Sequence, residues 1–286
     1  MKYFKIILVF LIAVSCKEDG TQPQNEEDID YNAFSKRTFE LYVPPTYNAN
    51  NPTPLVFAFH GYGGDGAGMR ILTAFDDHAI EKNFIVCYPD AAVSNWNEGC
   101  NCNNASRLGI DDVGFVNYLI DLISQNYNVD TTKIFAAGYS QGGFFVNNLA
   151  CKLSNRISKI AVVCGAVSNQ LSQGCFPSNN SSVLMIQGTN DQSVLYNGVP
   201  SGNFSYLSAK SGAKFWGNKN GCDSEPVTEN LPDNGDPAIT VLKETYIDCN
   251  DNVSVILYSV FNGSHGWYKS ADINTTETIV EFFFDN

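Results

Sequence analysis

The residues around Ser140 form a pattern that is typical of a nucleophilic serine. GYSQG at 138–142 fits Gly-x-Ser-x-Gly. The apolar run before it, 133–138, indicates a buried strand, and the apolar-faced segment after it, 141–153, indicates a helix. A strand that turns this sharply into a helix holds the serine hydroxyl above the sheet, and the glycines leave room for the turn. We therefore predict that Ser140 is a nucleophile; the alternative is a glycine-rich turn without reactivity.

A serine hydroxyl reacts slowly unless a base removes its proton, and histidine is the usual base near neutral pH. The chain has three histidines, His60, His78 and His265. His265 follows the last expected strand, and parallel strands end at the same edge of a sheet, so it should share an edge with Ser140. We predict His265 as the base. His60 ends a strand beside a glycine-rich loop and is expected to support that loop, and His78 lies inside an expected helical stretch far upstream.

An acid must orient the imidazole, and Asp191 is the strongest candidate for this role. It follows an expected strand within QGTND at 187–191. It also gives the chain order Ser, Asp, His that α/β-hydrolases have. Asp248 and Asp251 are weaker alternatives, because they lie between two strands that we expect to be antiparallel. For Asp191 itself, the alternative is a carboxylate that caps a helix or a turn.

Backbone N–H groups must stabilise the negative oxygen that forms when a serine attacks an ester. Gln141 can supply one such group because it begins the helix that follows the serine. HGYGG at 60–64, where a strand ends in a glycine-rich loop, can supply the other. We predict the amides of Gln141 and Tyr62 as the oxyanion hole.

Strands and helices alternate along the rest of the chain. Apolar or alternating runs predict strands at 37–43, 54–60, 84–88, 133–138, 157–164, 183–187, 239–247 and 253–260. Helices are expected from residue 111, over 141–153, over 206–217 and from the Asn274-x-x-Glu277 capping pattern. This alternation predicts an α/β fold with a mostly parallel sheet and helices on both faces, in one domain over 33–286.

The first residues have the character of a sorting signal. Lys2 and Lys5 precede an apolar run, 6–14, that ends at a small residue and Cys16. We predict a signal peptide over 1–15 that resembles a bacterial lipoprotein signal, with Cys16 lipidated and a flexible acidic tether to residue 32. The protein would then lie in the cell envelope, at the outer-membrane surface, or be secreted. The alternative is a plain secretory signal in which Cys16 is incidental.

An exported chain makes disulfides the best explanation for most of its cysteines. The segment between Cys222 and Cys249 is rich in Pro, Asn, Asp and Gly, and a disulfide would close it. Cys151 and Cys175 are the second expected pair. The pairing of the others stays open, and two of them lie in apolar runs that suit small buried side chains, Cys87 and Cys164.

Composition excludes several classes of function. Seventeen Lys and Arg residues against thirty Asp and Glu give a formal charge of −13, which disfavours nucleic-acid binding. No apolar run reaches the roughly eighteen residues of a membrane-spanning helix, so membrane contact is expected through the lipid anchor alone. A structural metal is not expected, because no zinc-ligand spacing occurs. The protein is expected to be a monomer.

Five motifs together resemble one family. HGYGG, GIDDVGFV, GYSQGG, QGTND and SHGW, over residues 37–284, are similar to those of secreted esterases that include polyhydroxybutyrate depolymerases, feruloyl esterases and acetyl xylan esterases of carbohydrate esterase family 1. The resemblance implies an α/β-hydrolase fold without a cofactor, and Ser140, Asp191 and His265 as its triad. In the relatives a proline often follows H-x-W, whereas Tyr268 follows Trp267 here.

The loop at 91–109 links a strand end to a helix and should overhang the active-site edge. Trp96 in this loop, together with Trp267 and Tyr62, is expected to bind substrate, with Cys100 and Cys102 bracing the loop; the alternative is that Trp96 packs within its own loop. We favour cleavage of feruloyl or acetyl esters on plant cell-wall polysaccharide. The alternatives are a polyhydroxybutyrate-type polyester depolymerase, a peptidase of the same fold, and a glycan-binding lipoprotein on an inactive hydrolase scaffold.

Overall fold

The site is positioned by a mixed sheet whose central strands are apolar on both faces. The computed structural model describes residues 30–235 and 239–284. The expected signal peptide, Cys16 and almost all of the tether therefore lie outside the described residues. The described strands are β1 (Phe39–Tyr42), β2 (Thr53–Phe59), β3 (Ile85–Pro89), β4 (Val129–Tyr139), β5 (Lys159–Val163), β6 (Ser182–Gly188), β7 (Val227–Asn230), β8 (Thr240–Tyr246) and β9 (Val255–Phe261).

These strands form one sheet in the order β1-β3-β2-β4-β5-β6-β9-β8-β7. The six strands from β3 to β9 run parallel, while β1 and the β8–β7 hairpin are antiparallel additions at the two edges. Every residue of β6 is buried, as expected for a parallel strand with helices on both sides. The parallel strands therefore present their carboxyl ends along a single edge.

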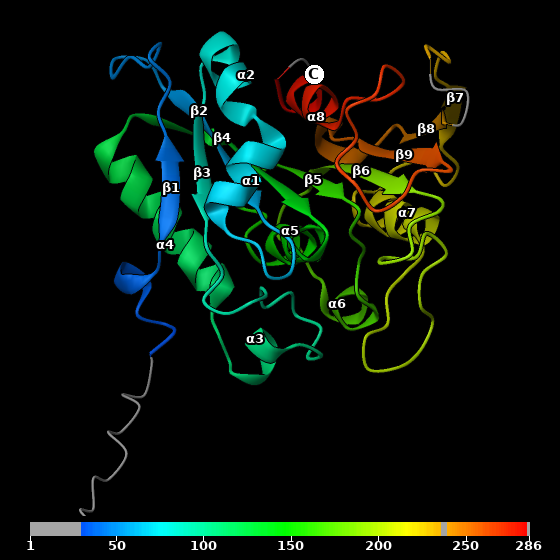
Figure 1. Ribbon diagram of the computed structural model, residues 1–286, viewed down its shortest axis with the longest axis horizontal. Coiled ribbons are helices and arrows are strands. Elements are labelled where there is room, and N and C mark those ends of the chain that lie inside the picture. The colour runs from blue at the N-terminus through cyan, green and yellow to red at the C-terminus, as the bar shows by residue number, and fades with distance from the viewer. Residues whose placement is uncertain (1–29, 236–238, 285–286) are drawn as a thin grey trace, which may run out of the picture. The chain divides into compact units, whose positions relative to one another are not determined.

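Helices cover both faces of the sheet. They are α1 (Gly66–Thr73), α2 (Phe75–Lys82), α3 (Asn104–Arg107), α4 (Asp112–Asn126), α5 (Gln141–Lys152), α6 (Asn169–Gly174), α7 (Ala209–Lys219) and α8 (Thr275–Phe284), with short 3₁₀ turns at Phe34–Lys36 and Asn250–Asn252. One apolar core lies between the sheet and α4, α5 and α7, and the other between the sheet and α1, α2 and α8 (Figure 1). The α/β architecture predicted from the sequence is confirmed.

The predicted elements match the observed ones within a few residues, and the omissions are short elements. The sequence analysis assigned no elements to α1, α3, α6 or the short edge strand β7. The predicted capping residue of the last helix is correct, because the Oδ1 of Asn274 accepts a hydrogen bond from the Thr276 amide at 3.1 Å. Described residues from Tyr31 onward belong to one compact unit.

Three disulfides occur in the described residues. Cys151–Cys175 and Cys222–Cys249 are the two predicted pairs, and Cys100–Cys102 closes a small ring within the loop after β3. The two remaining described cysteines, in apolar runs, are buried and unpaired, as expected: Cys87 and Cys164. The covalent framework thus suits an oxidising, extracellular environment.

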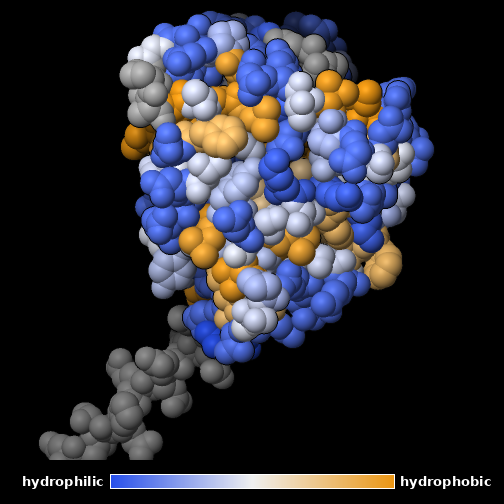
Figure 2. All heavy atoms as spheres, turned by 90° about the vertical axis from the view of Figure 1, so that its right-hand side faces the viewer, coloured by the Kyte–Doolittle hydropathy of each residue, from blue (hydrophilic) through white to orange (hydrophobic). Residues whose placement is uncertain are grey.

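The surface on the side of β7 and β8 is mainly hydrophilic, with small separated hydrophobic patches (Figure 2). Among the described residues, the helices are all too short or too polar to cross a bilayer.

Candidate active site

Ser140 occupies the sharp turn between β4 and α5. Its backbone has φ 55° and ψ −119°, a conformation that an L-residue adopts only under constraint. The Ser140 amide donates a hydrogen bond to the carbonyl of Val163, at 2.8 Å, which ties the turn to the end of β5. The strained turn predicted from the motif is therefore present.

The glycines beside Ser140 are required by close backbone contacts. A Cβ added to Gly142 would lie 2.2 Å from the carbonyl oxygen of Phe59 and 2.7 Å from that of His60. A Cβ on Gly138 would lie 2.1 Å from the carbonyl oxygen of Gly142. The start of α5 thus packs directly on the end of β2, and this contact brings the serine beside the glycine-rich loop.

Gly142→Ala is expected to lower the free energy of unfolding by at least about 2 kcal/mol, because neither strand nor helix can yield to the new methyl group cheaply. Denaturant unfolding followed by circular dichroism measures the change. Gly174→Ala is the matched control, since a Cβ there meets nothing within 4 Å. Equal stability of the two variants would contradict the packing described here.

His265 and Asp191 form a hydrogen-bonded pair at the same sheet edge. The Nδ1 of His265 lies 2.7 Å from the Oδ2 of Asp191. The Asp191 side chain is fully buried, and its Oδ1 accepts hydrogen bonds from the amides of Ser193 and Val194, at 2.8 and 2.9 Å. Gln187 donates a further bond to Oδ2 at 3.0 Å. These donors suit an ionised carboxylate, which fixes the imidazole with Nδ1–H toward the acid.

The imidazole lies next to the residue that precedes the serine. The rings of Tyr139 and His265 have their centroids 5.2 Å apart. The sulfur of Cys164 lies within 4.8 Å of this pair, and its thiol donates a hydrogen bond to the carbonyl of Gly266 at 3.3 Å. Burial raises the pKa of Cys164 to about 12, so this residue remains a protonated thiol.

The glycine-rich loop after β2 lies beside Ser140. A Cβ on Gly61 would be 3.2 Å from the serine Cβ. In the described part of the chain, neither the Tyr62 amide nor the Gln141 amide has an acceptor, so both are available for an oxyanion. This arrangement is what an oxyanion hole needs.

His60 supports the loop. Its Nε2 accepts a hydrogen bond from the Ala91 amide at 3.1 Å, which leaves the proton on Nδ1, 2.7 Å from the carbonyl of Gly61. Burial lowers the pKa of His60, so the imidazole stays neutral. The expectation of a supporting role fits these contacts.

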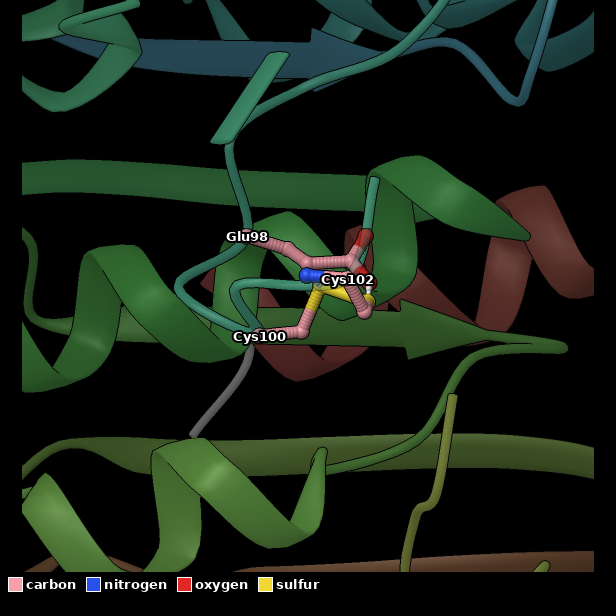
Figure 3. A group of neighbouring side chains, drawn as sticks. All are labelled: Glu98, Cys100 and Cys102. Atoms are coloured by element: carbon pink, nitrogen blue, oxygen red, sulfur yellow. Dashed lines mark hydrogen bonds between the residues drawn. A yellow bond between two sulfur atoms is a disulfide. The ribbon is translucent and has the colours of Figure 1, made fainter. Parts of the chain in front are cut away.

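The loop after β3 is fastened to Gln141, which the sequence analysis did not anticipate. The Oε1 of Gln141 accepts a hydrogen bond from the Trp96 amide. The Nε2 of the same side chain donates one to the Trp96 carbonyl and one to the Oε2 of Glu98. Glu98 is only 1% exposed, and burial raises its pKa to about 8. Its side chain extends toward the Cys100–Cys102 disulfide (Figure 3). Those two sulfurs, being bonded to each other, offer no thiolate to a metal.

A pocket of about 310 Å³ opens at Ser140. The loop after β3 contributes mainly polar side chains to its walls, whereas α5 and the loop after β6 contribute both apolar and polar ones. The lining residues that matter for chemistry are Tyr62, Glu98, Ser140, Gln141, Phe144 and Phe204. The exposed Tyr62 ring therefore lies where a substrate would pass, and its binding role remains a prediction.

Neither tryptophan can bind substrate as predicted. Trp96 is 0% exposed, its ring is stacked on Phe145 with centroids 5.1 Å apart, and its Nε1 donates to the His60 carbonyl. The side chain belongs to the core beneath the loop and leaves no face for a sugar or phenolic ring. Trp267 is also buried, and its Nε1 donates to the Oγ1 of Thr276 at 2.9 Å. Through this bond Trp267 attaches the loop that contains His265 to helix α8.

The fold and the geometry at this edge define an α/β-hydrolase. An acetyl xylan esterase from Aspergillus awamori has the same fold, with a TM-score of 0.67 at 16% identity over 89% of this chain and 96% of that one. A family model described as "Putative esterase" matches residues 33–266. The chain belongs to this Esterase family.

Two relatives are feruloyl esterases by name. Feruloyl esterase B of Piromyces equi is 29% identical over 233 residues, and feruloyl esterase D of Neurospora crassa is 28% identical over 187 residues. The alignments cover 78% and 60% of this chain but only 41% and 59% of those proteins. The chain thus spans about half the length of these relatives.

Proposed function

We propose that the protein is a serine ester hydrolase in which Ser140 is the nucleophile, His265 the base and Asp191 the acid that orients it. The observation that carries this proposal is the hydrogen bond between the buried Asp191 and the partly exposed His265, at the edge where the strained serine turn also lies. Strain at a turn is costly and is typical of functional sites. A structural turn alone would need no oriented imidazole beside it.

The reaction follows from these positions. His265 takes the proton of the Ser140 hydroxyl as its oxygen bonds to the ester carbonyl carbon, and the amides of Tyr62 and Gln141 stabilise the resulting oxyanion. Collapse of this intermediate breaks the ester bond, and the alcohol leaves with the proton from the imidazole. Water then attacks the acyl-enzyme by the same route and releases the carboxylic acid.

Feruloyl or acetyl groups on plant cell-wall polysaccharide are the substrates that we propose. The names of the relatives from Piromyces equi and Aspergillus awamori support these two acyl groups. The pocket at the serine has aromatic side chains, Phe144 and Phe204, on one wall, and these favour an aromatic acyl group over a small one.

The test is a set of esters assayed side by side with the fragment that begins at residue 28. Methyl ferulate, acetylated xylan and polyhydroxybutyrate are incubated with the protein, and the released acids are quantified. We expect ferulate or acetate release that is abolished in Ser140→Ala. Release of hydroxybutyrate alone would replace the proposed substrate, and no release from any ester would overturn the enzyme function.

We propose in addition that Cys16 carries a lipid anchor. The basic start, the short apolar run and the cysteine after a small residue support this proposal. Cys16→Ala should move the protein from the membrane fraction to the soluble fraction of its host. Membrane association of that variant would contradict lipidation.

A further inference from the structure

Gln141 carries two functions in one residue. Its backbone N–H is one of the two proposed oxyanion donors, while its side chain is held by three hydrogen bonds to the loop after β3. The Oε1 accepts from the Trp96 amide at 2.9 Å, and the Nε2 donates to the Trp96 carbonyl at 2.8 Å and to Glu98 at 2.5 Å. All polar atoms of this side chain are therefore satisfied, and its orientation is unambiguous because the Trp96 backbone presents both a donor and an acceptor.

Glu98 is the one of these partners that a side-chain substitution can remove. Without its carboxyl, one N–H of the partly buried Gln141 side chain would lose its acceptor, which favours a turn of that side chain toward a new one. Since Gln141 is the first residue of α5 and directly follows Ser140, such a turn would displace its amide from the oxyanion position. Displacement of a single donor by a fraction of its hydrogen-bond length weakens stabilisation of the transition state.

We propose that Glu98 is a positioning residue that holds the Gln141 amide in the oxyanion hole. This inference rests on the proposed ester hydrolysis. The carboxyl accepts the hydrogen bond whether or not it is ionised, but its charge matters to the reaction. A neutral Glu98 leaves the pocket uncharged on this side, whereas an ionised one places a negative charge in the pocket where the oxyanion develops.

The surroundings favour the neutral form near pH 7. The groups next to the Glu98 carboxyl are the side-chain amide of Gln141 and the disulfide of Cys102, and neither carries a charge. The nearest charged groups that hold this loop are Arg37, which precedes β1, and Asp112, the first residue of α4. They form an ion pair at 2.7 Å without net charge, and Asp112 accepts a hydrogen bond from the Asn97 amide. With burial unopposed by a cation, the pKa of Glu98 is raised to about 8.

Two substitutions separate positioning from simple packing. Glu98→Gln keeps an acceptor for Gln141 and removes the charge, whereas Glu98→Leu keeps a similar volume and removes the acceptor. With methyl ferulate and p-nitrophenyl acetate, we expect Glu98→Leu to lower kcat about 10-fold to 100-fold with little change in KM, because one oxyanion donor is misplaced. Glu98→Gln should retain most of the activity at pH 7. Glu225→Gln, at an exposed site, is the control for the same chemical change.

The pH profile is the readout that a merely structural role would not alter. In the parent, kcat should fall as the pH rises through about 8, because ionised Glu98 opposes the oxyanion; Glu98→Gln should show no fall there. A loss of stability in Glu98→Leu with unchanged kcat for the folded fraction would overturn the proposal. A change in KM alone would do the same.

A spectroscopic titration tests the inference independently of turnover. In ¹⁵N-labelled protein, the Gln141 backbone amide resonance should shift with a midpoint near pH 8 in the parent and not in Glu98→Gln. If the protein hydrolyses no ester, this titration still decides whether the ionisation of Glu98 affects the backbone amide of Gln141. A Gln141 resonance that does not respond to pH would overturn the proposal even if the esterase activity is present.

Discussion

Replacing Ser140 with alanine is expected to lower kcat for p-nitrophenyl acetate by about 10⁵-fold or more, to the level that binding and the oxyanion hole alone sustain. The turn remains possible, since alanine tolerates the space that serine occupies, so the loss reflects the missing hydroxyl. Initial rates at saturating ester measure the effect. No acyl-enzyme can form in this variant because the nucleophilic oxygen is gone.

Ser158→Ala is the matched control for this prediction. Ser158 directly precedes β5, at the amino end of a parallel strand, and so lies at the opposite edge of the sheet from Ser140. This variant should keep the parent rate. If Ser140→Ala retained more than about a hundredth of the parent activity while folding normally, the nucleophile would have to be a different residue.

Asp191→Asn is expected to lower kcat about 10⁴-fold with little loss of fold. An asparagine can keep its side-chain oxygen toward the amides of Ser193 and Val194 only by turning its NH₂ group toward His265. The imidazole must then accept at Nδ1 and carry its proton on Nε2, the nitrogen that has to receive the serine proton. The base is therefore lost although the residue is still present. Activity at saturating substrate and the pH dependence of kcat measure the effect.

The rival carboxylate supplies the control. Asp251 lies in the connection from β8 to β9, at the amino end of β9, where its carboxylate accepts a hydrogen bond from Asn180 at 2.8 Å. Asp251→Asn should leave kcat unchanged. A large loss in that variant, with Asp191→Asn active, would assign the acid to the other end of the sheet.

The parts of the site that could be predicted from sequence are those that topology alone determines. Residues that follow parallel strands meet at one edge, so Ser140, Asp191 and His265 could be assigned from their places after β4, β6 and β9. The strained turn was predictable for a related reason, because a strand and a helix joined by so few residues require small neighbours.

Side-chain direction within a loop could not be predicted in this way. Trp96 lies in a segment whose composition indicates exposure, yet its ring packs on Phe59 and Phe145, which belong to β2 and α5. The partners are distant in sequence, and no local pattern identifies them. The same holds for Glu98, because a charged loop residue is normally exposed, and its partner Gln141 lies 43 residues away.

The omission of α1 has a local cause. Its first residues include two glycines, which are poor helix formers, and it ends at Ala74 with φ 50°, where α2 begins at once in a new direction. The apolar periodicity therefore breaks in the middle of the segment, and a pattern that depends on one continuous helix face does not detect it.

The most direct test of the central claim is covalent labelling with a fluorophosphonate, which reacts with a serine only when a base activates it. We expect one adduct per chain, located by peptide mass spectrometry on Ser140, absent in Ser140→Ala and formed much more slowly in Asp191→Asn. An adduct on a different residue, or an unlabelled protein that still hydrolyses esters, would contradict the account.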